Sequence, residues 1–245
     1  MPSDFEKIIK DAKKGFIIKP AIHFFGGEPL LNPYFGEIIK IAEKNNFQCS
    51  LTTNGILLSK YLDDILKNRK LNQINISLDD IGEKHDSLRN FSGSFKEAIS
   101  SINKIREREA KKKNQKRKII NINCIINSEN YDHLFDIFSY YSENNIDIDM
   151  LVFQHQYGGE NNYDIKKLKD QILKLKEAKT SFEIAIIPNV DMHFLDKFYA
   201  HSSKKISGKC PIPWVGLNIM PNLDVTPGGG VLGCNQVIGS LKAVS

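Results

Sequence analysis

The sequence predicts an α/β protein in which parallel strands alternate with helices. Short apolar runs rich in β-branched residues alternate with longer segments whose apolar residues recur at helical spacing. Each connection between the first strands is long enough to hold a helix, as a parallel crossover requires. Glycines and polar residues follow the ends of several strands, where α/β folds bind their ligands. Right-handed crossovers of this kind curl a sheet into a full or partial (β/α) barrel.

The elements follow from these patterns in chain order. A first helix is expected from Ser3, which can cap it, to about Lys14. A second is expected to begin at Asn32, with Pro33 in its first position. The expected strands are residues 21–25, 47–53, 73–78, 119–126, 150–154 and 183–187, and the further helices are 60–66, from 94 into the basic connection, 131–143, 165–176 and 191–198.

The pattern changes after residue 154. From Cys210 onward the chain is rich in proline and glycine, and residues 217–220 and 224–226 are expected to form a hairpin. We therefore expect two domains, a partial barrel over residues 1–156 and an extension over residues 157–245.

Composition excludes several classes of protein. The chain has 245 residues, of which 41% are hydrophobic and 26% charged, as in ordinary globular proteins. No stretch approaches the ~20 apolar residues that span a bilayer, and the N-terminus has no apolar signal core, so we expect a cytoplasmic location and no membrane partner. Part of the net charge of +5 lies in residues 111–118, a basic run without interleaved aromatic residues. Such a run is typical of a solvated connection, and nucleic-acid binding is not expected.

The motif Gly26-Gly27-Glu28 carries the most functional information, because it directly follows the first predicted strand. Glycines let the main chain approach a ligand closely, and Glu28 supplies a charged acceptor. Further motifs follow in order: Thr52-Thr53-Asn54-Gly55, Ile76-Ser77-Leu78-Asp79, His85-Asp86-Ser87-Leu88-Arg89 and Gly93-Ser94-Phe95. In that order and at those spacings, the chain resembles the radical S-adenosylmethionine (radical SAM) family over about residues 4–154.

The resemblance implies a radical SAM type of (β/α) barrel, here without its first strand, and a site for S-adenosylmethionine. Gly26, Gly27 and Glu28 match the family turn that holds the methionine amino group. Ser77 matches a serine expected near the ribose or carboxylate. Further contacts are expected from residues at the same rim, with Arg89 able to pair bidentately with a carboxylate: Thr52, Asn54, Asp79 and Arg89.

The family also carries a [4Fe–4S] cluster on a Cys-x-x-x-Cys-x-x-Cys loop, since one iron must stay open while three thiolates hold the others. This sequence has no such loop, and Cys49 and Cys124 are expected to be buried in strands. We therefore expect the chain by itself not to cleave S-adenosylmethionine reductively. The resemblance implies a fragment, a product of a shortened reading frame or one half of a split enzyme, and we expect a possible partner that supplies the missing first strand.

The tail resembles the SPASM/twitch extension of peptide-modifying radical SAM proteins. The matching segments run from Cys210 to Trp214, over Leu217-Asn218-Ile219 and from Asp224 to Pro227. An auxiliary metal cluster there would need Cys210, Cys234 and ligands from outside the chain. The alternative is two free thiols beside a proline-rich hairpin.

The resemblance favours a radical SAM protein that modifies a peptide or protein, with catalytic residues unassigned. One alternative is a degenerate, non-catalytic homologue that acts as a binding or partner module, and another is nucleic-acid binding through residues 111–118. His155 and Tyr157 could face a substrate, although a lone histidine there is more often a packing residue. His23 is expected to lie beside core residues in a structural role.

Overall fold

A computed structural model describes residues 1–15, 20–112, 116–155, 163–193, 195, 216–227 and 237–241 of the chain. The chain divides into two compact units. The first holds the described residues up to Met192, and the second holds those from His193 onward. Each unit is described here by itself.

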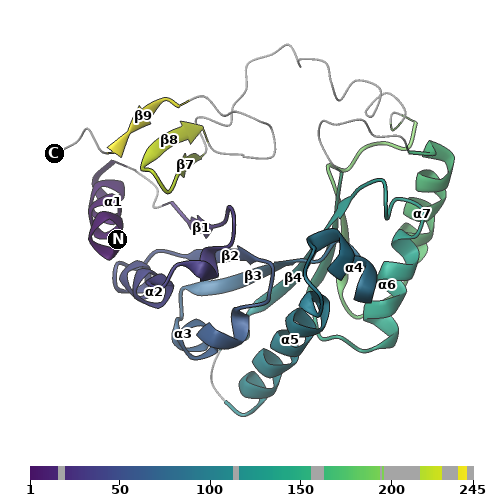
Figure 1. The fold of residues 1–245 in the computed structure, drawn as a ribbon, viewed down its shortest axis with the longest axis horizontal. Coiled ribbons are helices and arrows are strands. Elements are labelled where there is room, and N and C mark those ends of the chain that lie inside the picture. The colour runs from purple at the N-terminus through teal and green to yellow at the C-terminus, as the bar shows by residue number, and fades with distance from the viewer. Residues whose placement is uncertain are drawn as a thin grey trace. The chain divides into compact units, whose positions relative to one another are not determined.

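The first unit is built on a six-stranded parallel sheet whose strands lie side by side in chain order (Figure 1). This confirms the α/β fold with a sheet of the partial-barrel type. Among the described residues the strand at one end, β1, pairs on one side only, so a partner that adds a strand there stays a prediction. The strands are β1 (Ile22–Phe24), β2 (Cys49–Thr53), β3 (Leu71–Ser77), β4 (Ile119–Ile126), β5 (Met150–His155) and β6 (Glu183–Ile187).

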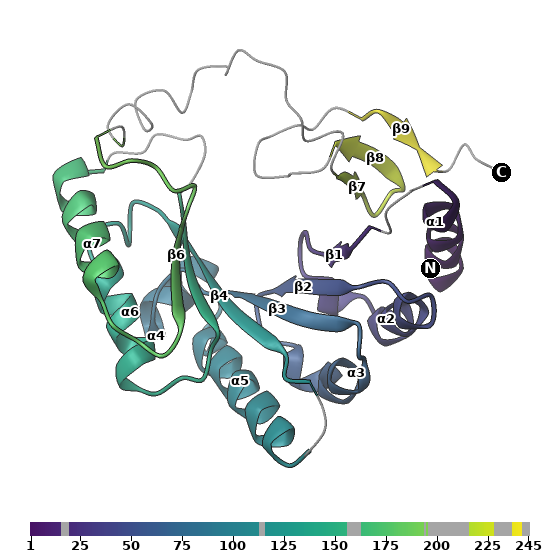
Figure 2. The ribbon, with the colours of Figure 1, turned by 180° about the vertical axis from the view of Figure 1, so that it is seen from behind.

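Helices cover one face of this sheet. Figures 1 and 2 show α2, α3, α5, α6 and α7 along the convex side of the curved sheet, and no described helix lies against its concave face. The helices are α1 (Pro2–Gly15), α2 (Phe35–Lys44), α3 (Leu62–Lys67), α4 (Gly82–Arg89), α5 (Ser94–Ala110), α6 (Leu134–Glu143) and α7 (Ile165–Glu177), with two short 3-10 helices, η1 (Pro29–Leu31) and η2 (Leu58–Tyr61).

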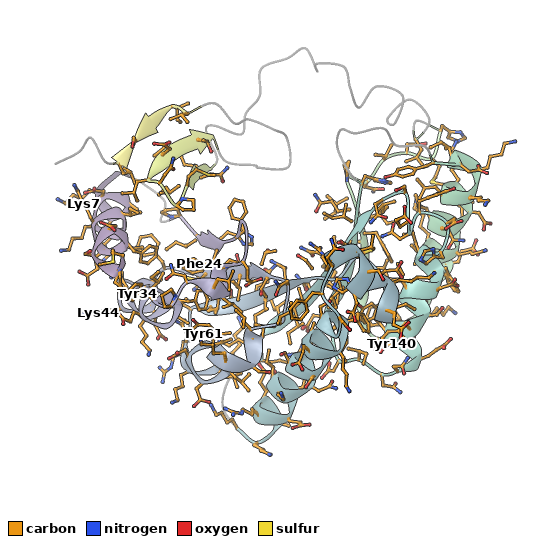
Figure 3. The ribbon with its side chains drawn as sticks, in the orientation of Figure 1. Lys7, Phe24, Tyr34, Lys44, Tyr61 and Tyr140 are labelled. Atoms are coloured by element: carbon orange, nitrogen blue, oxygen red, sulfur yellow. The ribbon has the colours of Figure 1, made fainter. Side chains whose placement is uncertain are left out.

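The core lies between the sheet and the helices. Alternate residues of each central strand are apolar and have no exposed surface, among them Leu51, Ile76 and Ile122. A line of aromatic rings extends this core to the N-terminal edge, since Phe24 contacts Phe35 (ring centroids 5.8 Å apart), which contacts Tyr61 (5.4 Å). Figure 3 labels Phe24 and Tyr61. A sheet covered on one face needs this period-two alternation, because successive side chains point to opposite faces.

Three helices differ from the expectation, of which α6 begins at Leu134 rather than at residue 131. α2 begins at Phe35 rather than at Asn32, because Asn32 has an extended backbone (φ −69°, ψ 115°) and its Oδ1 accepts a hydrogen bond from the Tyr34 amide. A residue before proline avoids the helical region, which explains the later start after Pro33. α4 was not predicted, because its eight residues include few apolar side chains to give a helical period.

The basic connection is not solvated throughout. Lys118 is 3% exposed, and its Nζ donates to the carbonyl oxygens of Asn68 (2.5 Å) and Leu71 (2.6 Å). Burial lowers the pKa of the Lys118 ammonium to about 8. The sequence could not show this, because the two carbonyls lie far from Lys118 along the chain. Residues 113–115 of the run lie outside the described residues.

The last part of the sheet extends past the boundary expected at residue 156. β6 pairs in parallel with β5, from Met150 opposite Glu183 to Gln154 opposite Ile187, so α7 and β6 belong to the first unit. No helix in the described ranges is long and apolar enough to cross a membrane.

The second unit contains the expected hairpin. Strand β7 (Leu217–Ile219) pairs antiparallel with β8 (Asp224–Pro227), and β8 pairs with β9 (Gly239–Ser240). The turn between β7 and β8 includes Leu223 at φ +67°. Cys210, Cys234, Tyr157 and most of the helix expected at 191–198 lie outside the described residues.

Candidate functional site

The turn after β1 is formed by two glycines in the left-handed region, Gly26 at φ +85° and Gly27 at φ +50°. Glycine adopts this backbone without the strain that a Cβ atom would cause. A Cβ atom built on either residue meets nothing within 4 Å. The backbone itself therefore requires the glycines, and the turn presents open main chain.

Glu28 ties this turn to the end of β2. Its Oε1 accepts hydrogen bonds from the Leu30 amide (3.0 Å) and the Thr53 hydroxyl (2.7 Å), and its Oε2 accepts one from the Asn54 amide (2.7 Å). Charge-assisted bonds of this kind are strong. Glu28 therefore holds two strand ends in place.

Gly55 shows how closely the sheet packs on α5 at this rim. A Cβ atom at Gly55 would lie 2.8 Å from the Cβ of Ala98 and 3.0 Å from Cγ2 of Ile76. Its φ of +86° also favours glycine. The end of β2 therefore packs closely against α5, and this contact positions Asn54 at the rim.

Asp79 plays the corresponding part at the end of β3. Its Oδ1 accepts from the Ile125 amide (3.1 Å), and its Oδ2 lies 2.5 Å from Nη2 of Arg89. The carbonyl oxygen of Asp79 accepts from the Asn130 side chain at 2.6 Å. These bonds join β3, β4 and α4 and place the guanidinium of Arg89, which is 37% exposed, at the rim.

His85 belongs to this rim although sequence reasoning did not include it among the site residues. It is 1% exposed, and its Nδ1 accepts a hydrogen bond from the Asp79 amide (3.2 Å). Burial, and next the positive charge of Arg89, lower the pKa of His85 below its usual value. The imidazole is therefore neutral near pH 7. The sequence did offer one indication of this role, because His85 is the first residue of the motif that ends at Arg89.

Asp86 caps α5 from the neighbouring helix. Its carboxylate accepts hydrogen bonds from the Gly93 amide (2.6 Å), the Ser94 hydroxyl (2.8 Å) and the Phe95 amide (2.9 Å). Partial desolvation raises the pKa of Asp86, but these three bonds outweigh it, so the pKa lies below the usual value. The cap holds Ser94 and the loop before it against α4.

These elements enclose a cavity of about 270 Å³, close to the lower end of the range for small-molecule sites, about 300–1,000 Å³. Six of the eight residues implied by the resemblance line it, and Glu28 and Asp79 each lie one hydrogen bond or ion pair behind a residue that does. The lining residues are Gly26, Gly27, Thr52, Thr53, Asn54, Ile56, Ser77, His85, Arg89, Phe91 and Ser94.

The two other histidines of interest lie in different environments. His155 is 1% exposed, and burial lowers its pKa to about 4, so it is a neutral buried residue rather than one facing a substrate. His23, expected beside the core, is exposed instead. Its ring nitrogens lie 2.6 Å from the Ser50 hydroxyl and 3.0 Å from the Thr52 hydroxyl.

The described residues do not fit an iron–sulfur cluster. Cys49 and Cys124 are free and buried, as expected. Burial raises the pKa of Cys49 to about 12 and that of Cys124 well above its usual value, whereas a metal ligand is a thiolate. Within the described ranges no group of three His, Cys, Asp or Glu side chains could hold a metal ion.

The chain is similar to curated proteins of archaea. It is 23% identical over 202 residues to an Fe-coproporphyrin III synthase of Methanosarcina barkeri, covering 82% of this chain and 47% of that protein. It is 32% identical over 186 residues to a probable GTP 3',8-cyclase of Methanococcus aeolicus, covering 73% of this chain and 58% of that protein. The chain thus spans about half the length of the curated relatives it matches.

Solved structures share the fold. SuiB of Streptococcus suis bound to S-adenosylmethionine matches with a TM-score of 0.69 and 18% identity, over 98% of this chain and 56% of that one. Native anSMEcpe with bound AdoMet and Cp18Cys peptide matches with a TM-score of 0.66 and 16% identity, over 98% and 69%. The model of the radical SAM superfamily, whose members use S-adenosylmethionine and a [4Fe–4S] cluster, matches residues 2–141. Because this match covers more than half of the sequence, the chain belongs to the radical SAM superfamily.

Proposed function

We propose that this chain provides the S-adenosylmethionine site of a radical SAM protein that modifies a peptide or protein. The observation that carries the proposal is the cavity at the ends of β1, β2 and β3. It gathers residues that lie up to 68 positions apart in the sequence, from Gly26 to Ser94, and most of them belong to the motifs that match the family in order.

Each part of the cavity suits one part of S-adenosylmethionine. The main chain at Gly26 and Gly27 can bind the methionine amino group, and Arg89 offers guanidinium donors to the carboxylate. The hydroxyl of Ser77 can hydrogen-bond the ribose, and the half-exposed ring of Phe91 offers an apolar face to adenine. Glu28 and His85 act as positioning residues, because their polar atoms hold backbone amides of the rim.

A peptide substrate is supported by relatives rather than by the cavity. SuiB has been solved with its precursor peptide SuiA, and anSMEcpe with the Cp18Cys peptide. The two curated relatives named above are instead an Fe-coproporphyrin III synthase and a probable GTP 3',8-cyclase. We also propose that residues 157–245 form a SPASM/twitch-like extension of this protein.

The alternative is a non-catalytic binding module on the same scaffold. It is favoured by the observation that the described cysteines are buried apart from each other and form no metal site. Anaerobic reconstitution of this chain alone should release no 5′-deoxyadenosine from S-adenosylmethionine under either function, because the sequence has no three-cysteine loop. The same assay with a second chain that supplies such a loop separates the two functions. Release of 5′-deoxyadenosine then supports the enzyme, and its absence with retained S-adenosylmethionine binding supports the module.

The S-adenosylmethionine site is tested by titration calorimetry on the wild-type chain, Arg89→Gln and a matched control, Arg108→Gln. Arg108 lies on α5 and pairs with Asp63 away from the cavity. A hydrogen bond to a charged group contributes about 1.5–3 kcal/mol, so Arg89→Gln should weaken binding at least about tenfold. The control should bind as the wild type does. No detectable binding by the wild type would refute the site, and equal binding by Arg89→Gln would remove Arg89 from it.

A further inference from the structure

The concave face of the sheet carries a line of uncharged side chains that are hydrogen-bonded across four strands. Nδ2 of Asn121 in β4 donates to Oδ1 of Asn75 in β3 (3.0 Å), and Nδ2 of Asn75 donates to the Thr52 hydroxyl in β2 (3.4 Å). Thr52 in turn contacts His23 in β1 at 3.0 Å. We call this set the amide ladder: His23, Ser50, Thr52, Gln73, Asn75 and Asn121.

The ladder lies on the face that the helices leave uncovered. Ile74 and Ile76 flank Asn75 in β3 and have no exposed surface, and Ile76 lies beside Ala98 of α5. Because successive side chains alternate between faces, Asn75 points away from the helices. The register places Asn121 directly opposite Asn75, so both belong to the concave face.

At one end of the ladder, Asn121 has an acceptor atom without a donor. Oδ1 of Asn121 is buried and has no hydrogen-bond partner among the described residues, and the side chain is 6% exposed. Nδ2 of the same side chain donates to Oδ1 of Asn75. That oxygen also accepts a second hydrogen bond, from Nε2 of Gln73 (2.9 Å). Nearly all buried polar groups in native proteins are paired, so this acceptor marks a place for a donor that the described residues do not supply.

The chemistry of the face selects a neutral ligand. The strand residues of β1 to β5 on this face include no Lys, Arg, Asp or Glu. His23 is exposed by surface area, but the residues packed around its ring partly desolvate it and lower its pKa, so the ring is neutral near pH 7. Phosphates and carboxylates are bound by cationic side chains or by several converging N–H groups. Asn121 offers them an acceptor oxygen instead, which suits an N–H donor.

We propose that the amide ladder recognises a neutral amide group of the substrate, from a peptide backbone or an Asn or Gln side chain, whose N–H binds Oδ1 of Asn121. This inference rests on the proposed function and names the substrate class for it. Thr52 belongs to both the ladder and the cavity that we assign to S-adenosylmethionine. A peptide on the ladder is therefore adjacent to that cavity, as a reaction between the two ligands requires.

The experiment is a titration of ¹⁵N-labelled protein followed by NMR, with and without saturating S-adenosylmethionine. The probes are the blocked neutral peptide acetyl-Gly-Asn-Gly-amide and, for comparison, GTP. The side-chain NH₂ signals of Asn75 and Asn121 report on the ladder directly, and the Asn121→Leu variant identifies the second of them. We expect a saturable shift of both signals with the peptide and none with GTP.

The Asn121→Leu variant removes the open acceptor and leaves Oδ1 of Asn75 paired with Gln73. It should weaken peptide binding at least tenfold and leave the melting temperature unchanged or higher. The matched control is Asn103→Leu, which makes the same chemical change at an exposed position of α5. It should bind the peptide as the wild type does.

The outcomes separate this inference from the proposed function. Absence of a peptide-induced shift in the wild type, shifts induced by GTP, or unchanged peptide binding by Asn121→Leu would each overturn the ladder as an amide site, even if S-adenosylmethionine binds. Peptide binding at the ladder with no binding of S-adenosylmethionine would instead sustain the ladder and refute the cofactor site.

Discussion

The two faces of the parallel sheet differ in almost every physical respect. On the convex face, alternate residues such as Ile74 and Ile122 are apolar, have no exposed surface and pack under helices. On the concave face, their direct neighbours in sequence, such as Asn75 and Asn121, are polar and bonded to one another across strands. Because the side chains alternate along each strand, one stretch of sequence serves both faces.

This difference indicates that stability and recognition are separated across the thickness of one sheet. Burial of apolar surface between sheet and helices provides most of the folding free energy. The polar face contributes little of that burial and keeps hydrogen-bonding groups for a ligand. Only the rim at the strand ends combines the two roles, since Glu28 and Asp79 both fix the backbone and support residues of the cavity.

The sharpest test of this separation uses two adjacent residues of β4. Ile122→Ala removes a side chain with no exposed surface, and such changes cost about 2–5 kcal/mol of unfolding free energy. Asn123→Ala changes a half-buried residue of the other face and should stay within about 0.5 kcal/mol of the wild type. Urea denaturation measures both. Equal losses for the two variants would mean that the two faces contribute alike to stability.

Asn130 tests whether the rim belongs to the stable side. It has no exposed surface, and its Nδ2 donates to the carbonyl oxygens of Asp79 (2.6 Å) and Ile125 (2.9 Å). Asn130→Ala removes two hydrogen bonds and leaves each carbonyl only a longer one, from Sγ of Cys124 (3.3 Å) and Nδ2 of Asn127 (3.2 Å). At about 0.5–1.5 kcal/mol for each lost bond, the variant should lose about 1–3 kcal/mol. Asn127→Ala is the control and should lose less, because Asn127 is a half-buried residue of the same loop that makes one longer bond to Ile125 (3.2 Å). If the two variants unfolded at the same urea concentration, the stability of the rim would not depend on Asn130.

Asp86 gives the rim a pH dependence of known sign. Its pKa lies below the usual value in the folded protein, so its contribution is present above the unfolded pKa of about 3.9 and is lost as pH falls through the folded pKa. Asp86→Asn keeps an acceptor oxygen but removes the negative charge at the start of α5, which should cost about 0.3–1 kcal/mol at pH 7.

The measurement is the melting temperature of Asp86→Asn and the wild type between pH 7 and pH 3. We expect the two curves to converge toward the acid end. A difference that stays constant over this range would mean that the carboxylate charge of Asp86 does not stabilise the start of α5.

Arg89 should show the smallest effect on stability and a clear effect on binding. The side chain is 37% exposed, and ion pairs of this kind contribute about 0.2–1 kcal/mol. Arg89→Gln should therefore unfold at nearly the wild-type urea concentration while binding S-adenosylmethionine more weakly. A large loss of stability would assign Arg89 to the structural side of the rim, together with Asp79.

Much of the fold could be predicted because its signals are local. The bounds of β4 and β6 agree with the expected ranges 119–126 and 183–187, since each is a continuous run of strand-forming residues with clear turn residues around it. Helix starts were harder. α2 begins later than expected because the backbone of Asn32 is set by Pro33 after it and by its own side-chain bond to Tyr34.

The sequence by itself determined the alternation of strands and helices, the two-sided pattern of each strand and the family motifs at the strand ends. Only the tertiary structure decided which polar residues meet. Asn75 and Asn121 are 46 positions apart, and Glu28 and Asn54 are 26 apart, yet both pairs are hydrogen-bonded. Lys118 is buried against carbonyls 47 and 50 positions away. Periodicity along a chain reports which face a side chain takes, whereas its partner depends on strand order and register, which form only when the sheet assembles.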